Sequence, residues 1–353
     1  MRAVRFHGRG DIRLDEVEEP VCGNGQVKIR PAFVGICGSD IHEYLAGPTL
    51  VPVTPHPLTG DKLPTTLGHE FSGTIEEVGP GVTGFKVGDQ VTVKPDVFDS
   101  TCSNCSMGRF TSCERLGFIG FSSQAGGLSD HIVVDSKHAI LLPDSIPLDI
   151  GALVEPLAVA WHAVSRSPLQ TNDTVLVVGA GPIGLAIIQV LKTKGVTSII
   201  AVDVAERRRE FALALGATEV LNPVDADAVT QVRALTGNVG AAISFECSGV
   251  QAGLDTAIAG LRVRGTIVMV SLWEQKPLID VFDIVFREKH VIGAIIYDDG
   301  DFEAVIDAIA SGGIQPRAMI TSKIRMEDVD ERGFKALIGQ RDKHIKILVD
   351  ISA

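Results

Sequence analysis

A small set of side chains in the first 155 residues has the chemistry of a zinc site. Cys37 offers a thiolate, His69 an imidazole, and Glu70 and Glu155 offer carboxylates. A catalytic zinc needs three protein ligands of these types and a fourth position open to water or substrate. Taken singly, each residue is more often a buried cysteine, a core histidine or a solvated acid. Taken together, they meet the requirements of a catalytic zinc.

A second group consists of cysteines. Three of the six, Cys102, Cys105 and Cys113, fall within twelve positions. Residues 1–7 contain no apolar run typical of a secretion signal. In a chain without such a signal, clustered cysteines favour metal binding over disulfides. We therefore expect a second metal site and a reducing compartment, the cytoplasm.

Residues 175–184 have the pattern of a dinucleotide site, because four apolar residues lead into a Gly-x-Gly-x-x-Gly turn. Gly179 permits the tight turn, Gly181 leaves room for a pyrophosphate, and Gly184 lets the next helix pack closely. Asp203 follows a second apolar run at the spacing where an acid accepts hydrogen bonds from the adenosine ribose. The predicted cofactor contacts on this turn and acid are Gly179, Gly181, Pro182, Ile183, Gly184 and Asp203.

The acid favours NAD, because a carboxylate beside the ribose would repel the 2′-phosphate of NADP. Arginines 207–209 follow directly, however, and such residues serve NADP sites. NADP therefore remains the alternative cofactor.

The elements that must position these residues fall into two classes. Antiparallel strands are expected near residues 26–34, 72–79, 88–93 and 128–134, where polar and apolar residues alternate. Helices are expected at 153–165, 183–194, 206–215 and 302–311. Further strands are expected at 175–178, 198–202, 219–221, 241–245, 265–270, 291–295 and 345–350. The pattern predicts an α/β protein in which a doubly wound parallel sheet, residues 156–295, is inserted into a β-rich domain of residues 1–155 and 296–353.

Length and composition agree with this organisation. The 353 residues, 45% of them hydrophobic, are enough for two domains with large cores. A net charge of −12 provides no basic face for nucleic acid or anionic lipid. No run approaches the roughly 20 apolar residues of a membrane span.

The motifs resemble those of the zinc-dependent medium-chain dehydrogenases, which couple a Cys-x-x-Asp-x-His segment and a Gly-His-Glu segment to a downstream Gly-x-Gly-x-x-Gly. These motifs occupy residues 37–42, 68–70 and 179–184, and residues 87–91 also match. Residues 155–160 are similar to the polyol and butanediol branch. The resemblance covers essentially the whole chain. It implies a Rossmann NAD-binding domain inserted beside a GroES-like catalytic domain.

The resemblance also implies roles for individual residues. Cys37, His69 and an acid hold the catalytic zinc, with Glu70 and Glu155 sharing the third position, one bound and one water-linked or exchanging. Zinc lowers the pKa of the substrate hydroxyl, and the substrate carbon then delivers hydride to the nicotinamide. Ser39 passes the alcohol proton onward and His42 takes it toward solvent.

A second, structural zinc is implied by the family pattern Cys-x-x-Cys-x-x-Cys-x7-Cys. Cys102, Cys105 and Cys113 match three of its positions, and Asp99 stands at the first. A carboxylate oxygen is an acceptable zinc ligand, so Asp99 can complete the tetrahedron. Arg208 lies where NAD-type members carry a basic residue. The strand near 291–295 invites pairing of nucleotide domains, as in the family's dimers and tetramers.

The loop between the zinc motifs, residues 42–60, is similar in amino-acid sequence and length to that of the butanediol-oxidising members. It implies oxidation of (R,R)-2,3-butanediol to acetoin and the reverse reduction of acetoin or diacetyl. Glu155 would then accept a hydrogen bond from the second hydroxyl. The alternatives are a sorbitol or xylitol dehydrogenase, a non-catalytic NAD-binding protein, and a zinc-independent quinone reductase.

Overall fold

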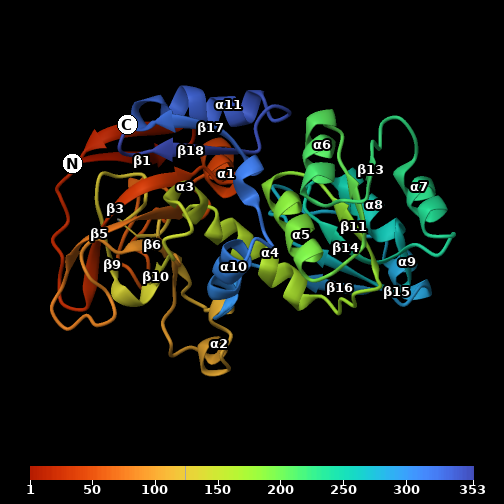
Figure 1. The fold of residues 1–353 in the computed structure, drawn as a ribbon, viewed down its shortest axis with the longest axis horizontal. Coiled ribbons are helices and arrows are strands. Elements are labelled where there is room, and N and C mark those ends of the chain that lie inside the picture. The colour runs from red at the N-terminus through yellow and green to blue at the C-terminus, as the bar shows by residue number, and fades with distance from the viewer. Residues whose placement is uncertain (124) are drawn as a thin grey trace. The chain divides into compact units, whose positions relative to one another are not determined.

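The computed structural model describes residues 1–123 and 125–353. The chain forms two compact units. The first contains Met1–Glu155 together with Ile320–Ala353, and the second contains Pro156–Met319. Both termini therefore belong to the first unit, where they are labelled in Figure 1.

The first unit is built on short antiparallel strands, as the alternation of polar and apolar residues predicts. Its main sheet has the order β10-β6-β5-β3-β18-β17, with β9 also paired to β3, and a smaller sheet has the order β2-β1-β4. The strands are β1 (Arg2–Gly8), β2 (Asp11–Glu16), β3 (Gln26–Gly35), β4 (Thr65–Thr66), β5 (Glu70–Val78), β6 (Gln90–Val93), β7 (Asp96–Val97), β8 (Gly117–Phe118), β9 (Ile132–Asp135), β10 (Ala139–Leu141), β17 (Ile320–Arg325) and β18 (Lys346–Asp350). The helices are α1 (Gly38–Ala46), α2 (Ser103–Ser106), α3 (Leu148–Gly151), a π-helix (Val329–Phe334) and α11 (Lys335–Gly339).

Strand β18 carries the end of the chain into the main sheet, between β3 and β17. It pairs antiparallel with β3 and parallel with β17. Ile347 and Val349 are buried in the same core as Phe6, Ile29 and Phe71. The last residues of the chain thus help to build the unit that the first residues begin.

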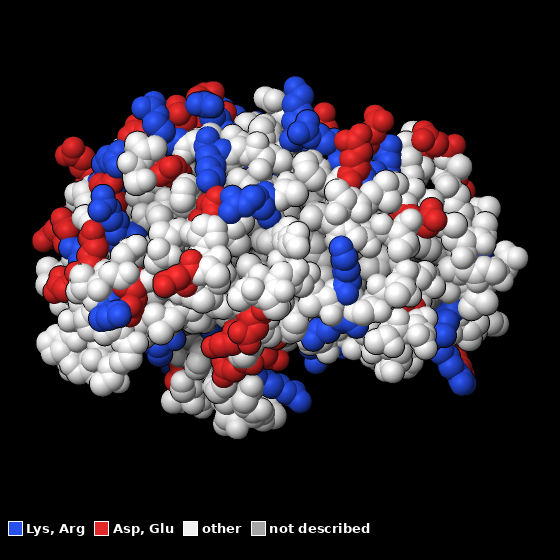
Figure 2. All heavy atoms as spheres, viewed as in Figure 1, with Lys and Arg blue, Asp and Glu red and all other residues white. Residues whose placement is uncertain are grey.

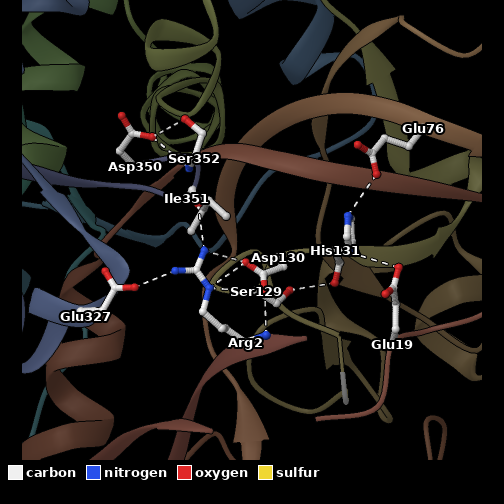
Figure 3. A network of polar contacts seen from close by, with 10 residues as sticks. All are labelled: Arg2, Glu19, Glu76, Ser129, Asp130, His131, Glu327, Asp350, Ile351 and Ser352. Carbon is white, nitrogen blue, oxygen red and sulfur yellow. Dashed lines mark hydrogen bonds and ion pairs between the residues drawn. The ribbon is translucent and has the colours of Figure 1, made fainter. Parts of the chain in front are cut away.

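Arg2 fastens the two ends of the chain together (Figure 3). Its guanidinium donates to Asp130 and to Glu327, and it also reaches the carbonyl oxygen of Ile351 at 3.4 Å. The backbone N–H of Arg2 donates to Asp130 as well, at 2.6 Å. One side chain therefore joins β1 to the segment before β9 and to the C-terminal residues.

The second unit is a six-stranded parallel sheet in the order β13-β12-β11-β14-β15-β16. The strands are β11 (Thr174–Val178), β12 (Ser198–Val202), β13 (Glu219–Leu221), β14 (Ala241–Glu246), β15 (Leu261–Met269) and β16 (His290–Gly293). The helices are α4 (Val154–Arg166), α5 (Pro182–Thr193), α6 (Glu206–Leu215), α7 (Ala228–Leu235), α8 (Gln251–Ala259), α9 (Val281–Phe286) and α10 (Asp301–Ala310). The order reverses between β11 and β14, which makes this pair the switch point of a doubly wound sheet.

The second unit extends further than the sequence pattern indicates, because the chain re-enters the first unit at Ile320 and not at residue 296. The reason is the packing of α10 and the segment after it. Thr193 of α5 donates to the carbonyl of Gly313, and Gln189 contacts Met319 and Gln315. These contacts tie the segment up to Met319 to α5.

Two surface features bear on partners. On the face shown in Figure 2, Lys and Arg are interspersed with Asp and Glu, and no broad basic area appears. Across residues 1–123 and 125–353, no helix is both long and apolar enough to span a membrane.

Candidate active site

Three predicted zinc ligands of the first unit lie together. The ligand atoms of Cys37, His69 and Glu70 are all within 4.8 Å of one another. Cys37 stands at the N-cap of α1, and Glu70 is the first residue of β5. Gly68, with φ of +98°, makes the turn before His69, and a Cβ there would lie 2.8 Å from the backbone nitrogen of Leu128. A helix start and a strand start thus converge on one point.

His69 is held in a form suited to metal binding. Its ring is 3% exposed and contacts the rings of Phe118 and Phe121. Burial lowers the pKa of His69 to about 4, so the imidazole is neutral at physiological pH. Its Nδ1 lies 3.6 Å from Asp40 Oδ1, and its Nε2 lies 3.4 Å from Ser39 Oγ. A neutral imidazole with one nitrogen facing a carboxylate is the usual state of a metal-bound histidine.

Asp40 is a site residue to which the sequence reasoning gave no role. It is fully buried and accepts a hydrogen bond from the backbone N–H of Cys37 at 2.8 Å. Burial, with a further contribution from Glu70, raises the pKa of Asp40 to about 8. Within the described residues, Asp40 Oδ1 and His69 Nδ1 have no hydrogen-bond partner. Asp40 therefore holds the Cys37 segment through this hydrogen bond and lies next to the imidazole.

Lys346 is the second residue that was missed. Only 1% of its side chain is exposed, and its ammonium donates to Glu70 Oε1 at 2.8 Å and to Oε2 at 2.6 Å. It also donates to the carbonyl oxygen of Ile36 at 3.2 Å. The signal in the sequence is a lysine inside the apolar run of residues 345–349. A buried charge of this kind requires a partner.

Glu155 lies close to this cluster without joining it. It is 4% exposed at the start of α4, and its charge contributes to the raised pKa values of Cys37 and Lys346. Among the described residues it is not part of the group whose ligand atoms lie within 4.8 Å.

The charges of the cluster suit a dication. Among the described residues, the three buried carboxyl groups of Asp40, Glu70 and Glu155 lie near one buried ammonium, that of Lys346. Burial first, and then Glu70, raise the pKa of the Cys37 thiol well above its usual value. A bound metal ion would supply the positive charge that this group lacks. A donor set of one thiol, one neutral imidazole and one carboxylate thus fits zinc.

Ser39 and His42 lie one turn apart on α1, so they share a face of the helix. Ser39 is beside His69, as given above, and His42 is partly exposed. His42 Nδ1 lies 3.3 Å from Thr49 Oγ1 in the loop that follows. The pair extends from the cluster toward solvent.

The second predicted metal group is also assembled. The ligand atoms of Asp99, Cys102, Cys105 and Cys113 lie within 4.8 Å of one another, and the three cysteines are 5–8% exposed. Asp99 Oδ1 accepts from the backbone N–H groups of Cys102 and Thr101, which lower the pKa of Asp99 to about 2. Its Oδ2 accepts no hydrogen bond in the described part of the chain, although Arg115 Nε is 3.4 Å away. The carboxylate is therefore ionised with one oxygen available, which fits the fourth ligand of a tetrahedral zinc.

The glycine turn of the second unit has the expected geometry. Gly179 has φ of +94°, and a Cβ there would lie 2.9 Å from the backbone of Cys247 and Ser248. A Cβ on Gly184 would lie 1.9 Å from the carbonyl oxygen of Gly179. Gly181 is the N-cap of α5 and Pro182 its first residue, and Ile183 follows. The turn thus opens onto a helix N-terminus, which favours phosphate.

Asp203 lies beside this turn. Its Oδ2 accepts from the backbone N–H of Ala180 and its Oδ1 from that of Ala205, both at 2.8 Å. Arg208 Nη1 lies 3.8 Å from Asp203 Oδ2. Arg209 donates to the carbonyls of residues 203 and 204, and Arg207 lies over the ring of Phe211. Only Arg208 of the three arginines is directed at the acid.

Comparison with known proteins identifies the domain families in the chain. Residues 23–144 match the alcohol dehydrogenase GroES-like domain, and residues 182–311 match the zinc-binding dehydrogenase domain. The chain is 42% identical to an (R,R)-butanediol dehydrogenase of Bacillus subtilis over 99% of both chains. It is 31% identical to a sorbitol dehydrogenase of the same species, over 96% of this chain and 94% of that protein. A crystal structure of a Bacillus subtilis 2R,3R-butanediol dehydrogenase superposes with a TM-score of 0.93 at 41% identity, over 99% of both chains.

Proposed function

The chain belongs to the zinc-binding alcohol dehydrogenases, and we propose that it oxidises (R,R)-2,3-butanediol to acetoin with NAD and reduces acetoin or diacetyl in reverse. The observation that carries the substrate is the 42% identity to a butanediol dehydrogenase over 99% of both chains. The reaction transfers a hydride from a secondary alcohol carbon and releases one proton.

Bound zinc would lower the pKa of the substrate hydroxyl, and NAD would accept the hydride. We propose that Cys37 and His69 hold the zinc and that Glu70 and Glu155 share the third protein position. Glu70 lies in the cluster but has Lys346 on both oxygens, whereas the charge of Glu155 is close enough to act on Cys37. Asp40 keeps the imidazole oriented from its other nitrogen.

The proton would leave through Ser39 and His42. Ser39 Oγ lies beside the ligand imidazole, and His42 lies one helical turn further on, partly exposed. A hydroxyl followed by an imidazole can carry a proton out of a buried site in two short transfers.

Recognition of the second hydroxyl of the diol is assigned to Glu155. A buried carboxylate that pairs with a substrate hydroxyl discriminates against alcohols that lack this hydroxyl, because the carboxylate is then left without a hydrogen-bond partner. The loop over residues 47–64 is a fixed structure, since buried Glu43 accepts from the Thr49 N–H and His56 lies 3.2 Å from the Leu116 carbonyl. A fixed loop supports a pocket of definite size.

A substrate panel tests the assignment. We expect the highest kcat/KM for (R,R)-2,3-butanediol, efficient reduction of acetoin and diacetyl, and much poorer activity on sorbitol, xylitol and L-threonine. A higher kcat/KM for sorbitol or xylitol would refute the assignment of butanediol as substrate and favour a polyol dehydrogenase. The similarity to a sorbitol dehydrogenase supports that alternative.

NAD is the proposed cofactor, bound by the turn of Gly179, Gly181, Pro182, Ile183 and Gly184, with Asp203 on the adenosine ribose. Asp203 is 7% exposed and has its carboxylate beside the turn. Arg208 would then serve to hold Asp203 and line the adenosine side. A higher kcat/KM with NADP than with NAD would overturn this assignment.

A structural zinc is proposed at Asp99, Cys102, Cys105 and Cys113. Elemental analysis should find two zinc ions per chain, and one in the Asp99→Ala variant. A single zinc that is unchanged in Asp99→Ala would eliminate this site and leave the catalytic one.

We propose a homodimer or homotetramer paired through the second unit. Strand β16 ends the parallel sheet, and helix α9 beside it in sequence exposes Phe282, Val285 and Phe286 by 64–72%. An exposed sheet edge next to large apolar side chains is typical of a subunit interface. Phe286→Asp should lower the mass measured by light scattering, whereas Val224→Asp, at an equally exposed valine elsewhere, should not. An unchanged mass for Phe286→Asp would contradict pairing through this surface.

The cytoplasm is the proposed location. All six cysteines are free, and three of them lie in the metal-type cluster. Thiols in this state suit a reducing compartment.

A further inference from the structure

Glu246 is a buried acid to which the function described above gives no role. It is the last residue of β14, and none of its surface is exposed. Among the described residues, no lysine, arginine or histidine forms an ion pair with it. A carboxylate in such a place must be satisfied by neutral donors, or its burial would be strongly unfavourable.

The donors come from two loops. Oε1 accepts from the backbone N–H of Ser248 at 2.8 Å, from the Ser248 hydroxyl at 2.6 Å and from the N–H of Gly249 at 3.0 Å. Oε2 accepts from the hydroxyl of Ser271. The backbone oxygen of Glu246 also accepts from the N–H groups of Val270 and Ser271. One residue therefore ties the loop after β14 to the loop after β15.

The two loops approach each other and the glycine turn closely. A Cβ on Gly249 would lie 3.1 Å from the carbonyl oxygen of Leu272, and one on Gly253 of α8 would lie 2.0 Å from the Ser248 hydroxyl. Gly179 approaches the backbone of Cys247 and Ser248, as described above. Glu246 also pairs in register with Val178, the residue before that turn. The loop after β14 and the dinucleotide turn thus start at the same edge of the sheet.

The position in the sheet indicates which part of the cofactor is concerned. A doubly wound sheet binds a dinucleotide in two halves that meet at the switch point. The half formed by β11, β12 and β13 carries the glycine turn and Asp203, which the proposed function assigns to the adenosine side. The half formed by β14, β15 and β16 is left for the nicotinamide side, and Glu246 organises its first two loops.

We infer that Glu246 is a positioning residue that fixes the floor of the nicotinamide-binding half of the cofactor site, an inference that rests on the proposed use of NAD. It acts through the loops at residues 247–249 and 270–272 and does not itself need to touch the cofactor. Its hydrogen bonds, rather than its charge, carry this role.

Calorimetric titration of the full-length protein with NAD and with ADP tests the inference, because ADP lacks the nicotinamide half. Glu246→Ala should weaken NAD binding at least about tenfold and ADP binding less than about twofold. Glu246→Gln keeps an acceptor at Oε1 and places an amide donor before Ser271, so it should stay within about threefold of wild type for both. Ser271→Ala frees only the second loop and should give an intermediate loss of NAD affinity. This variant tests the inference if Glu246→Ala does not fold.

Ser244→Ala is the matched control. Ser244 lies two residues earlier on β14 and is fully buried, and its hydroxyl has no hydrogen-bond partner in the described part of the chain. Its variant should bind NAD and ADP as wild type does. In steady-state assays, the Ser271→Ala loss should appear in the KM for NAD more than in kcat.

Equal weakening of NAD and ADP binding in Glu246→Ala and Ser271→Ala would overturn the inference, because it would indicate a general loss of structure. Unchanged NAD binding in both variants would overturn it as well, as would a tenfold loss in Glu246→Gln. A wild-type protein that binds ADP but not NAD would instead refute the proposed function, and the inference with it.

Discussion

Replacing Lys346 with methionine tests the buried ion pair at the heart of the candidate zinc centre. The substitution keeps most of the side-chain volume but removes the ammonium from Glu70, which is fully buried. Removing one partner of a buried pair leaves an uncompensated charge, and this costs about 3–5 kcal/mol. Lys346→Met should therefore lower the free energy of unfolding by that amount in metal-free protein.

The assay is urea unfolding in the presence of a chelator, so that metal binding does not contribute. Circular dichroism follows the whole chain, whereas the fluorescence of Trp161 and Trp273 follows the second unit, in which both tryptophans lie. The transition seen by circular dichroism should move more than the transition seen by fluorescence if the two units unfold separately.

A double-mutant cycle separates the pair from its surroundings. Glu70→Gln alone strands the ammonium, and the double variant Glu70→Gln with Lys346→Met strands neither group. The double variant should be more stable than the sum of the single losses indicates, with a coupling energy of about 2–3 kcal/mol. Single losses that simply add, or a Lys346→Met loss below about 1 kcal/mol, would refute the reasoning.

Three further predictions follow from the other sites. Cys37→Ala or His69→Ala should abolish turnover while NAD binding, measured by titration, persists, because metal and nucleotide are assigned to different units; near-normal turnover in either variant would show that the ligands are wrong. Asp203→Asn should raise the ratio of kcat/KM for NADP over NAD at least about tenfold, a change of about 1.4 kcal/mol, since the repelling charge is gone; an unchanged ratio would remove Asp203 from the ribose site. Burial alone would raise the pKa of Asp130, but the hydrogen bonds from Arg2 outweigh burial and lower that pKa. The pair therefore stabilises the fold above the unfolded-state pKa of about 3.9. This stability is lost as the pH falls through the lower folded-state pKa. Arg2→Gln should accordingly lower the thermal midpoint more near neutral pH than in acid below the unfolded-state pKa. An equal deficit at both pH values would contradict the role given to the pair.

The features that could be predicted from the sequence are those in which cause and effect lie close along the chain. The dinucleotide turn is one, because a buried strand, three glycines and a helix follow one another within about twenty residues. Helix α6 is another, with its predicted bounds of Glu206 and Leu215 confirmed. The six parallel strands were also placed correctly, since each is a short apolar run between helical segments.

The features that the sequence did not predict depend on contacts between residues that lie far apart in the chain. Lys346 was expected in the last strand, but its partner Glu70 lies 276 positions away in sequence, and no local pattern connects them. The predicted boundary at 296 was displaced for a similar reason. The local sequence of the segment up to Met319 resembles the beginning of a new domain. Its contacts with Gln189 and Thr193 attach it to the second unit. The helix that carries Ser39 and His42 was not anticipated either, because nine residues are too few for a clear periodicity.

The place of β18 in the main sheet has a consequence for how the protein is made. A ribosome that has passed β10 must add about 200 more residues before β18 emerges, which takes roughly 10 to 40 s at the ordinary speed of translation. During that interval, Phe33–Gly35 of β3 can pair with β5 but lacks β18 on its other side, and Glu70 lacks the ammonium of Lys346. The second unit, in contrast, has all of its sequence available once Met319 is synthesised. The part of the chain that begins first is thus the last to be completed. A premature stop before Lys346 leaves Glu70 of the candidate zinc centre without its counter-ion, however well the second unit folds.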